Sequence, residues 1–187
     1  MTNDLQFILR KWQFFMRSNQ DNHARHALFK DIWQHYYKRL FFFTQNMISV
    51  DVEDTVQDIM LKVYQNLEKY KPFYSFNTWI YSIARNHCIN LLQKKKLTTQ
   101  SLEDTKATIR IKSGENTPEK QVIYQEDFQQ IENYLNRLEP IYQQMAFLRF
   151  YEGLQVKQIA QILDVPPGTV KSRIHLIKKA LVKELEK

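Results

Sequence analysis

The sequence predicts an all-α protein made of two helical domains joined by a flexible linker. Only 3 of the 187 residues are glycine and 5 are proline, while residues that favour helices, such as Leu, Gln, Lys and Glu, are frequent. Several segments repeat apolar residues at spacings of three and four, the period of an amphipathic helix. This period is lost over residues 97–125, which are rich in Thr, Ser and charge. A segment of that length indicates a linker rather than a loop within a compact domain.

The composition is that of an ordinary soluble globular protein, because 43% of the residues are apolar and 25% are charged. The single cysteine, Cys88, excludes an internal disulfide and suits a reducing cytoplasm. No apolar run approaches the length that spans a bilayer, and the N-terminus lacks the layout of a signal peptide. We therefore expect a cytoplasmic protein with no membrane insertion.

The net charge of +7 is unevenly distributed along the chain. Residues 1–96 carry 14 Lys and Arg against 8 Asp and Glu, residues 97–130 carry 4 against 6, and residues 131–187 carry 9 against 6. Two basic blocks separated by a mildly acidic segment indicate either two modules that bind a polyanion or simply solvated basic surfaces. Nucleic acid is the natural polyanion to consider.

The first half of the chain predicts a domain of three helices over residues 26–96. The helices are expected over residues 26–45, 51–69 and 76–95. Their inward faces are expected to hold Leu28, Phe29, Ile32, Trp33, Tyr36 and Leu40, then Val52, Val56, Ile59, Val63 and Leu67, then Trp79, Ile80, Ile83, Ala84 and Leu91. Asp51 and Asp54 have the layout of a capping box at the start of the second helix. Residues 1–25 form an N-terminal extension. A further helix is predicted within it, and the element against which that helix packs is not identified from the sequence.

The second half predicts another helical domain over residues 126–187. Pro140 suits the first turn of a helix, where its missing N–H has no cost, and Gly153 suits the end of that helix. A short helix and a longer one follow. Their inward residues are expected to be Val156, Ile159, Ala160 and Leu163, then Val170, Ile174, Ile177 and Leu181.

The last two helices have the layout of a helix-turn-helix. Asp164 occupies the turn position that often carries Gly, and Asp tolerates the left-handed conformation better than most residues. Pro166 and Pro167 end the short helix and set the entry into the next one. Gly168 allows a close approach either to DNA or to the preceding helix, and Val165 is expected between the helices.

The outward face of the last helix is the strongest candidate for DNA binding. Its residues are Gly168, Thr169, Lys171, Ser172, Arg173, His175, Lys178 and Lys179. A helix N-terminus followed by Lys and Arg suits contacts with phosphates and with base edges in a major groove. The alternative is an amphipathic surface helix with a solvated basic face.

Three segments of the chain resemble a known family. YEGLQVKQIAQILDVPPGTVKSRIHLIKKAL resembles region 4 of the extracytoplasmic-function (ECF) sigma factors of bacterial RNA polymerase, with Pro167 where Glu is common, although regulators of the LuxR type share a similar helix-turn-helix. DVEDTVQDIMLKVYQNLEKY resembles region 2.2 of sigma factors, and FNTWIYSIARNHCINLLQKKK resembles regions 2.3 and 2.4. Because the segments stand in the family order, the chain is identified as a member of this family. The resemblance implies two partners, core RNA polymerase and promoter DNA, and a possible third, an anti-sigma factor.

Asp54, Gln57 and Asp58 lie on one exposed face of the second predicted helix. Such a face suits a basic protein partner, but from the residues alone a solvated face with acids placed by the helix dipole explains it better. The resemblance implies that this helix binds core polymerase at the clamp helices of its largest subunit. Region 4 is expected to meet the flap region of the second-largest subunit.

The third predicted helix and the loop before it are the candidates for promoter melting. Aromatic side chains can stack on unpaired bases, and the resemblance implies that this loop captures a base of the minus-ten element. The residues expected near DNA are Tyr74, Ser75, Phe76, Asn77, Arg85, Asn86, Asn90 and Lys94. At least one aromatic of this region is expected in the core instead, and Trp79 is expected to pack within the fold.

Nothing in the sequence indicates catalysis, a cofactor or a metal. His87 and Cys88 are adjacent on a helix, so their side chains point in different directions, and no partner stands at ligand spacing. We expect a sigma factor, which is not an enzyme. The alternatives are a free-standing helix-turn-helix regulator that acts without polymerase and a helical module that sequesters an anti-sigma factor.

Overall fold

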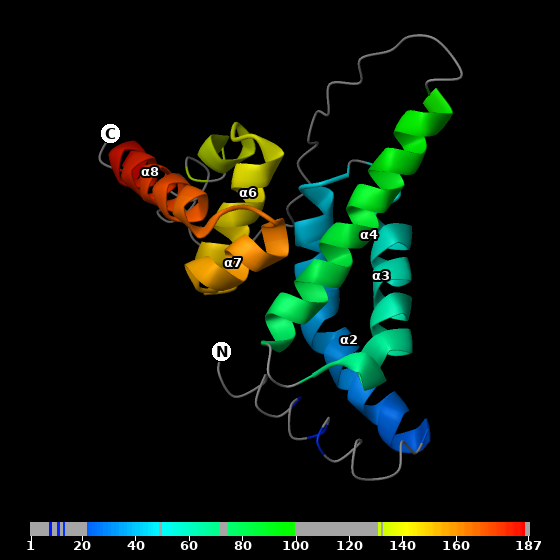
Figure 1. The fold of residues 1–187 in the computed structure, drawn as a ribbon. Coiled ribbons are helices and arrows are strands. Elements are labelled where there is room, and N and C mark those ends of the chain that lie inside the picture. Colours follow the sequence, from blue (N-terminus) through cyan, green and yellow to red (C-terminus); the bar gives the residue numbers. More distant parts are fainter. Residues whose placement is uncertain are drawn as a thin grey trace, which may run out of the picture. The chain divides into compact units, whose positions relative to one another are not determined.

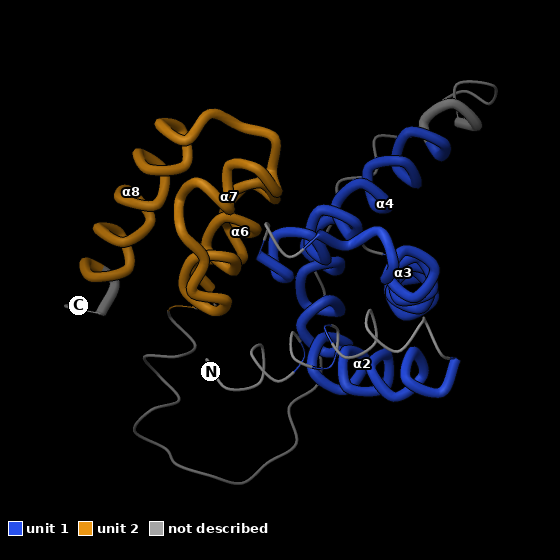
Figure 2. Tube along the Cα trace, turned by 60° about the horizontal axis from the view of Figure 1, so that its bottom comes forward, with its two compact units in different colours: residues 1–103 blue, residues 104–187 orange. Residues whose placement is uncertain are grey.

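The computed structural model describes residues 8, 11, 13, 22–48, 50–71, 75–99, 131 and 133–185. These residues form helices and turns, with no strand among them, so the predicted all-α class is confirmed. The chain divides into two compact units, Met1–Glu103 and Asp104–Lys187 (Figures 1 and 2). Within the described residues, no helix is both long enough and apolar enough to cross a membrane.

The first unit is a bundle of three long helices that contact one another pairwise (Figure 1). They are α2 (Asn22–Gln45), α3 (Val52–Asn66), which a 3-10 turn η1 (Leu67–Lys69) continues, and α4 (Phe76–Thr99). The predicted apolar stripes of α2 and α3 form its core: Leu28, Ile32, Tyr36, Leu40, Val56, Ile59 and Val63 are buried. Phe29 and Trp33 are only half-buried.

The N-terminal extension has a described contact with this bundle. Ile8 is buried, and the ammonium of Lys11 forms an ion pair with Asp31 of α2. Helix α4 continues to Thr99, beyond residue 96 where the first domain was expected to end. Most of the predicted linker and most of residues 1–25 lie outside the described residues.

The buried face of α4 differs from the prediction. Tyr81, His87 and Cys88 are buried, whereas Ile83 and Leu91 are only half-buried. Helix α4 contacts both α2 and α3, and its buried residues extend over a wider face than the predicted apolar stripe. Because burial raises the pKa of the Cys88 thiol to about 11, the thiolate form is disfavoured at neutral pH.

The predicted capping box at the start of α3 is wrong. Asp51 has φ 57° and ψ 37°, and its side chain makes no capping hydrogen bond. A capping side chain normally requires an extended backbone at this residue, and the left-handed conformation of Asp51 departs from it. The carbonyl of Asp51 still accepts the first bond of the helix, from the N–H of Thr55 at 2.9 Å.

The second unit holds shorter helices. Helix α6 (Pro140–Ala146) has Pro140 at its first turn, as predicted, and continues into a π-helical turn, η2 (Phe147–Tyr151). Gly153 ends this segment with φ 68°, and the N–H of Leu154 donates to the carbonyl of Leu148 at 2.9 Å. The prediction that Gly153 terminates the helix is therefore confirmed, because glycine adopts this conformation at little cost.

Helices α7 (Val156–Leu163) and α8 (Pro167–Leu185) form the helix-turn-helix. Asp164 has φ 51° and ψ 50°, as predicted, and the N–H of Val165 donates to the carbonyl of Ala160 at 3.1 Å. These features make a Schellman-type end to α7. A capping box between Gln155 and Gln158, which the sequence analysis did not identify, opens the same helix.

The two prolines have separate roles at the start of α8. Pro167 is its first residue, where proline suits a helix, and the carbonyl of Pro166 accepts the N–H of Val170 at 3.2 Å. Gly168 is not needed for packing, because a Cβ at this position meets no atom within 4 Å. The preceding helix therefore does not require glycine here. Val165 is half-buried.

Candidate nucleic-acid and protein interfaces

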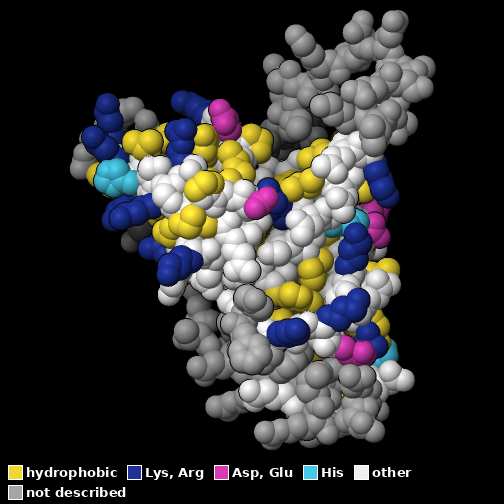
Figure 3. Space-filling model, in the orientation of Figure 1, with side chains coloured by type: hydrophobic (Ala, Val, Ile, Leu, Met, Phe, Trp, Pro, Cys, Tyr) yellow, Lys and Arg dark blue, Asp and Glu magenta, His cyan; other side chains and the backbone are white. Residues whose placement is uncertain are grey.

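The outward face of α8 is exposed along its length. All eight residues predicted to bind DNA, from Gly168 to Lys179, are exposed, while Val170, Ile174 and Ile177 are buried on the side where α8 contacts α6 and α7. Figure 3 shows Lys and Arg side chains gathered over α8, with a His side chain among them. The structure therefore presents a basic face on a helix whose other face is fixed by its neighbours.

Two side chains of this face have partners within the unit. The guanidinium carbon of Arg173 lies 4.6 Å from the centre of the Tyr142 ring on α6, a cation–π contact. The hydroxyl of Ser172 donates to the carbonyl of Thr169 at 3.0 Å. Leu176, which is not among the predicted DNA-binding residues, is 52% exposed within the basic face. The sequence feature that could have identified Leu176 is its position as an apolar residue between basic residues.

The face of α4 predicted to bind DNA is partly accessible. Asn86, Asn90 and Lys94 are exposed and Arg85 is half-buried. Asn77 is half-buried, and its side-chain oxygen accepts a hydrogen bond from the hydroxyl of Tyr36.

Of the loop residues predicted to lie near DNA, one is buried. Tyr74 lies outside the described residues. Ser75, just before α4, is half-buried and accepts the N–H of Trp79 at 3.1 Å through its carbonyl. Phe76 is 1% exposed, and its ring centre lies 5.6 Å from that of Tyr36 and 5.1 Å from that of Tyr70. A ring enclosed by core aromatics is not available to stack on a base, so Phe76 is an aromatic of this region that lies in the core, as was expected of at least one of them.

The neighbours of Phe76 belong to the same aromatic cluster. Tyr70 is buried, and burial raises the pKa of its hydroxyl to about 12. Trp79 is half-buried, with its ring centre 5.3 Å from that of Phe76. This cluster anchors the start of α4, and exposed side chains of the same helix follow further along, at residues 92–95.

The outer face of α3 carries the three residues predicted to bind core polymerase. Asp54, Gln57 and Asp58 are exposed, while Val56 and Ile59 between them are buried. The same face includes Leu61, which is 54% exposed and follows Asp58 and Gln57 by three and four positions. We call these four residues the α3 face. The sequence feature that could have identified Leu61 is its position as an apolar residue outside the predicted core stripe of this helix.

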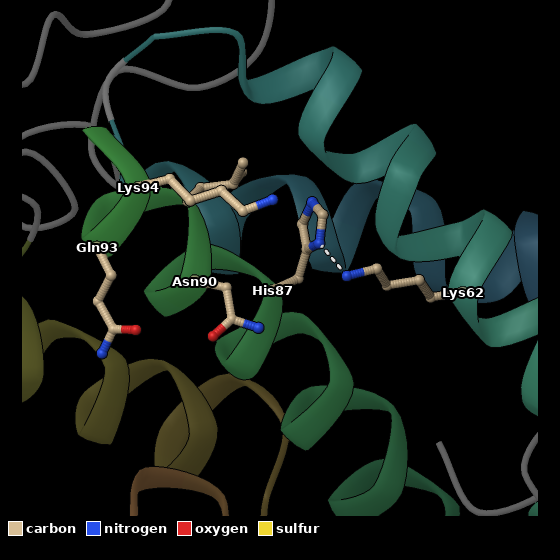
Figure 4. Close-up of a pocket in the computed structure, with 6 residues that line it drawn as sticks. Lys62, His87, Asn90, Gln93 and Lys94 are labelled. Atoms are coloured by element: carbon tan, nitrogen blue, oxygen red, sulfur yellow. Dashed lines mark hydrogen bonds between the residues drawn. The ribbon is translucent and has the colours of Figure 1, made fainter. Parts of the chain in front are cut away.

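A cleft of about 250 Å³ lies between α3 and α4, lined by Lys62, His87, Asn90, Leu91, Gln93 and Lys94 (Figure 4). The Nζ atom of Lys62 lies 2.6 Å from Nδ1 of His87. Burial, and next the positive charge of Lys62, lower the pKa of His87 below its ordinary value of 6.5. The imidazole is therefore neutral at pH 7, and its Nδ1 accepts a hydrogen bond from Lys62.

His87 does not form a metal site with its neighbours. Its Nε2 atom lies 3.7 Å from Oδ2 of Asp58, and Cys88 is buried in the core. Among the described residues, no group of three or more His, Cys, Asp or Glu side chains is placed to hold a metal ion.

Comparison with protein families finds two matches, one in each unit. Residues 32–98 match the family described as Sigma-70 region 2, and residues 128–181 match the family described as Sigma-70, region 4. The occurrence of both regions in one chain favours a sigma factor over a free-standing helix-turn-helix regulator. Sigma factors are non-catalytic transcription initiation factors.

Curated relatives of the chain are described as ECF RNA polymerase sigma factors. The chain is 28% identical over 165 residues to the ECF RNA polymerase sigma factor SigW of Bacillus subtilis, covering 84% of this chain and 88% of the relative. It is 32% identical over 144 residues to the ECF RNA polymerase sigma-E factor of Escherichia coli strain K12, covering 71% and 73%.

Solved structures share the fold. The sigma factor RpoE in complex with the anti-sigma factor NepR from Bartonella quintana aligns with a TM-score of 0.64 at 22% identity, covering 84% of this chain and 96% of that one. CnrH in complex with the cytosolic domain of CnrY aligns with a TM-score of 0.53 at 16% identity, covering 86% and 89%. Both family matches, together with the 32% identical ECF relative, lead to one conclusion: this chain belongs to the ECF sigma factors of RNA polymerase.

Proposed function

We propose that this chain binds core RNA polymerase, directs it to specific promoters and helps to open the DNA. The observation that carries the proposal is the exposed basic face of α8 in one unit together with the exposed α3 face in the other. One surface suits a polyanion and the other suits a protein. RNA synthesis belongs to the core enzyme, so we infer that the chain itself is not an enzyme and acts in the cytoplasm.

The proposed domains correspond to the two units that carry these surfaces and to the segments outside them. We propose residues 26–96 as region 2 and residues 126–187 as region 4, with 1–25 as an extension and 97–125 as the linker. The spans of the family matches, 32–98 and 128–181, support this division, and their ends differ from the proposed bounds by two to six residues.

Region 4 is proposed to bind the minus-thirty-five element as duplex DNA through α8. Gly168, Thr169 and Lys171 stand in the first turns of the helix, where base edges are reached in this motif. Arg173 is held on the ring of Tyr142, which limits the positions its guanidinium adopts. Lys178 and Lys179 lie further along the exposed face and suit phosphate contacts.

Region 2 is proposed to hold the minus-ten element as an opened strand. The residues assigned to it are Tyr74, Ser75, Asn77, Arg85, Asn86, Asn90 and Lys94, without Phe76. The exposed amides of Asn86 and Asn90 lie one helical turn apart on α4, so one strand can meet both of them.

The α3 face is proposed to dock on the clamp helices of the largest subunit of the polymerase. Asp54, Gln57 and Asp58 supply polar contacts, and Leu61 supplies the apolar one. Region 4 is proposed to contact the flap region of the second-largest subunit. Because one related solved structure is a complex of a sigma factor with an anti-sigma factor, we also propose that an anti-sigma factor holds this chain inactive.

The docking proposal is tested by measuring the affinity of core polymerase for the labelled full-length chain and for Leu61→Ala. Complete burial of a Leu side chain is worth about 1.5–3 kcal/mol, and Leu61 has 54% of its surface left to bury. The substitution should weaken binding roughly fourfold to fifteenfold. Leu92, 40% exposed on α4, provides the matched control, Leu92→Ala. Equal effects of the two substitutions, or none from either, would remove the α3 face as the docking surface.

A further inference from the structure

We propose that the cleft between α3 and α4 is a binding site for a phosphate group, in which Lys62 and Lys94 supply the charge. The proposal extends the proposed function, because the site lies beside the promoter-facing residues of α4. The cleft volume of about 250 Å³ is below the range of about 300–1,000 Å³ for pockets that enclose drug-sized ligands. A cleft of this size suits a small group rather than a whole cofactor.

The positive charges approach the cleft from two helices. Lys62 reaches His87 from α3, and Lys94 extends toward the same ring from α4 (Figure 4). Burial is the main cause that lowers the pKa of His87, and the positive charges of Lys62 and, to a smaller extent, Lys94 lower it further. Two like charges directed at the same ring favour an anion between or beside them, because the anion relieves their mutual repulsion.

His87 is the positioning residue of the site. Its side chain is buried, so the ring is fixed by the packing of α4, and its Nδ1 atom holds the ammonium of Lys62 at 2.6 Å. A lysine held in this way gives up less side-chain entropy when it binds an anion. The carboxylate of Asp58, 3.7 Å from Nε2 of His87, is 63% exposed. Water therefore screens part of its charge, although the carboxylate still affects the pKa of His87 more than Lys94 does. The two lysines outnumber this single carboxylate, so the surroundings of the ring keep a net positive charge.

The remaining polar residues suggest how a nucleic-acid strand would continue from the cleft. Asn90 and Gln93 line the cleft and are exposed, and in Figure 4 their amides project together from one side of α4. Asn86 stands one turn before Asn90. A sugar-phosphate chain that places one phosphate between the lysines can run along α4 past these three amides. Leu91 forms the apolar wall.

The same chemistry is available from two sources, a phosphodiester of the promoter strand and a free phosphate. Two arms of one experiment separate them. In the first arm, core polymerase carrying the full-length chain binds a promoter fragment whose minus-ten region is already single-stranded, over a series of salt concentrations. In the second arm, inorganic phosphate is titrated into the free full-length chain at constant ionic strength, and the thermal midpoint is recorded.

The variants are Lys62→Gln, Lys94→Gln, the double substitution, and Lys62→Arg, which keeps the charge. Lys38→Gln serves as the control, because Lys38 is exposed on α2 and does not line the cleft. Loss of one phosphate contact to a single strand lowers the slope of log K against log salt by about 0.7. Each Gln variant should show that loss, the double variant should lose no more than either single one, and Lys62→Arg and Lys38→Gln should retain the wild-type slope.

The outcomes separate cleanly. A reduced slope in both Gln variants assigns the site to the promoter strand. A rise of the midpoint with phosphate that the Gln variants lack, at unchanged slopes, assigns it to free phosphate. Unchanged slopes and no phosphate-dependent difference overturn the site. That result leaves the proposed function intact when the wild-type holoenzyme still binds the promoter, whereas failure of the wild-type holoenzyme to bind refutes the proposed function itself.

Discussion

Replacing Tyr142 by Leu removes the aromatic ring that the guanidinium of Arg173 contacts, and it should weaken promoter binding. The guanidinium carbon lies 4.6 Å from the ring centre, and a cation–π contact at an accessible site is worth about 0.5–1 kcal/mol. If the contact holds Arg173 in its DNA-binding position, its loss should reduce affinity about twofold to fivefold. Tyr142→Phe keeps the ring and should bind as the wild type does.

A double-mutant cycle isolates this contact from any change in folding. Holoenzyme affinity for a duplex promoter fragment is measured for wild type, Tyr142→Leu, Arg173→Ala and the double variant. Once Arg173 is absent, the Tyr142→Leu substitution should have no further effect, and the coupling energy should be about 0.5–1 kcal/mol. Additive losses, or a loss in Tyr142→Phe equal to that in Tyr142→Leu, would refute the positioning role.

Three further predictions concern stability, measured by urea denaturation of the full-length chain. Phe76→Ala should lower the free energy of unfolding of the first unit by about 3–5 kcal/mol, because a ring that is 1% exposed leaves a cavity. Gly168→Ala should raise the free energy of unfolding by about 0.4–1 kcal/mol, since its Cβ meets no atom within 4 Å. Gly153→Ala should lower it, because Gly153 has φ 68°. Lower promoter affinity in Gly168→Ala despite higher stability would show that DNA binding needs this glycine. Because the pKa of His87 is lowered by burial, the unfolded chain binds a proton that the folded chain does not, so stability should fall as pH drops below about 6.5, and His87→Gln should reduce that dependence.

Periodicity in the sequence predicts the buried positions that carry apolar side chains. Most of the predicted inward residues of α3, α7 and α8, such as Ile59, Leu163 and Val170, are buried, whereas Val52, Val156 and Leu181 are half-buried. The prediction is poorer for α4. Burial there extends to Tyr81 and His87, whose polar atoms made them poor candidates for a core.

The turns and the candidate sites show a second limit of prediction from the sequence. Asp164 was predicted in a left-handed conformation because a helix-turn-helix demands it there, but the same conformation at Asp51 had no motif to indicate it. The exposed residues of α8 follow from its apolar stripe. The contact of Arg173 with Tyr142 and that of Lys62 with His87 depend on how separate helices pack, which spacing within one helix does not contain.

The most direct test of the central claim is run-off transcription with purified core polymerase, on a promoter identified from DNA bound by the chain in vivo. We predict a promoter-specific transcript only when the full-length chain is added, and its loss when Lys171 and Arg173 are both replaced by Ala. A chain that does not associate with core polymerase and yields no transcript, yet binds a palindromic site tightly by itself, would contradict the sigma-factor account.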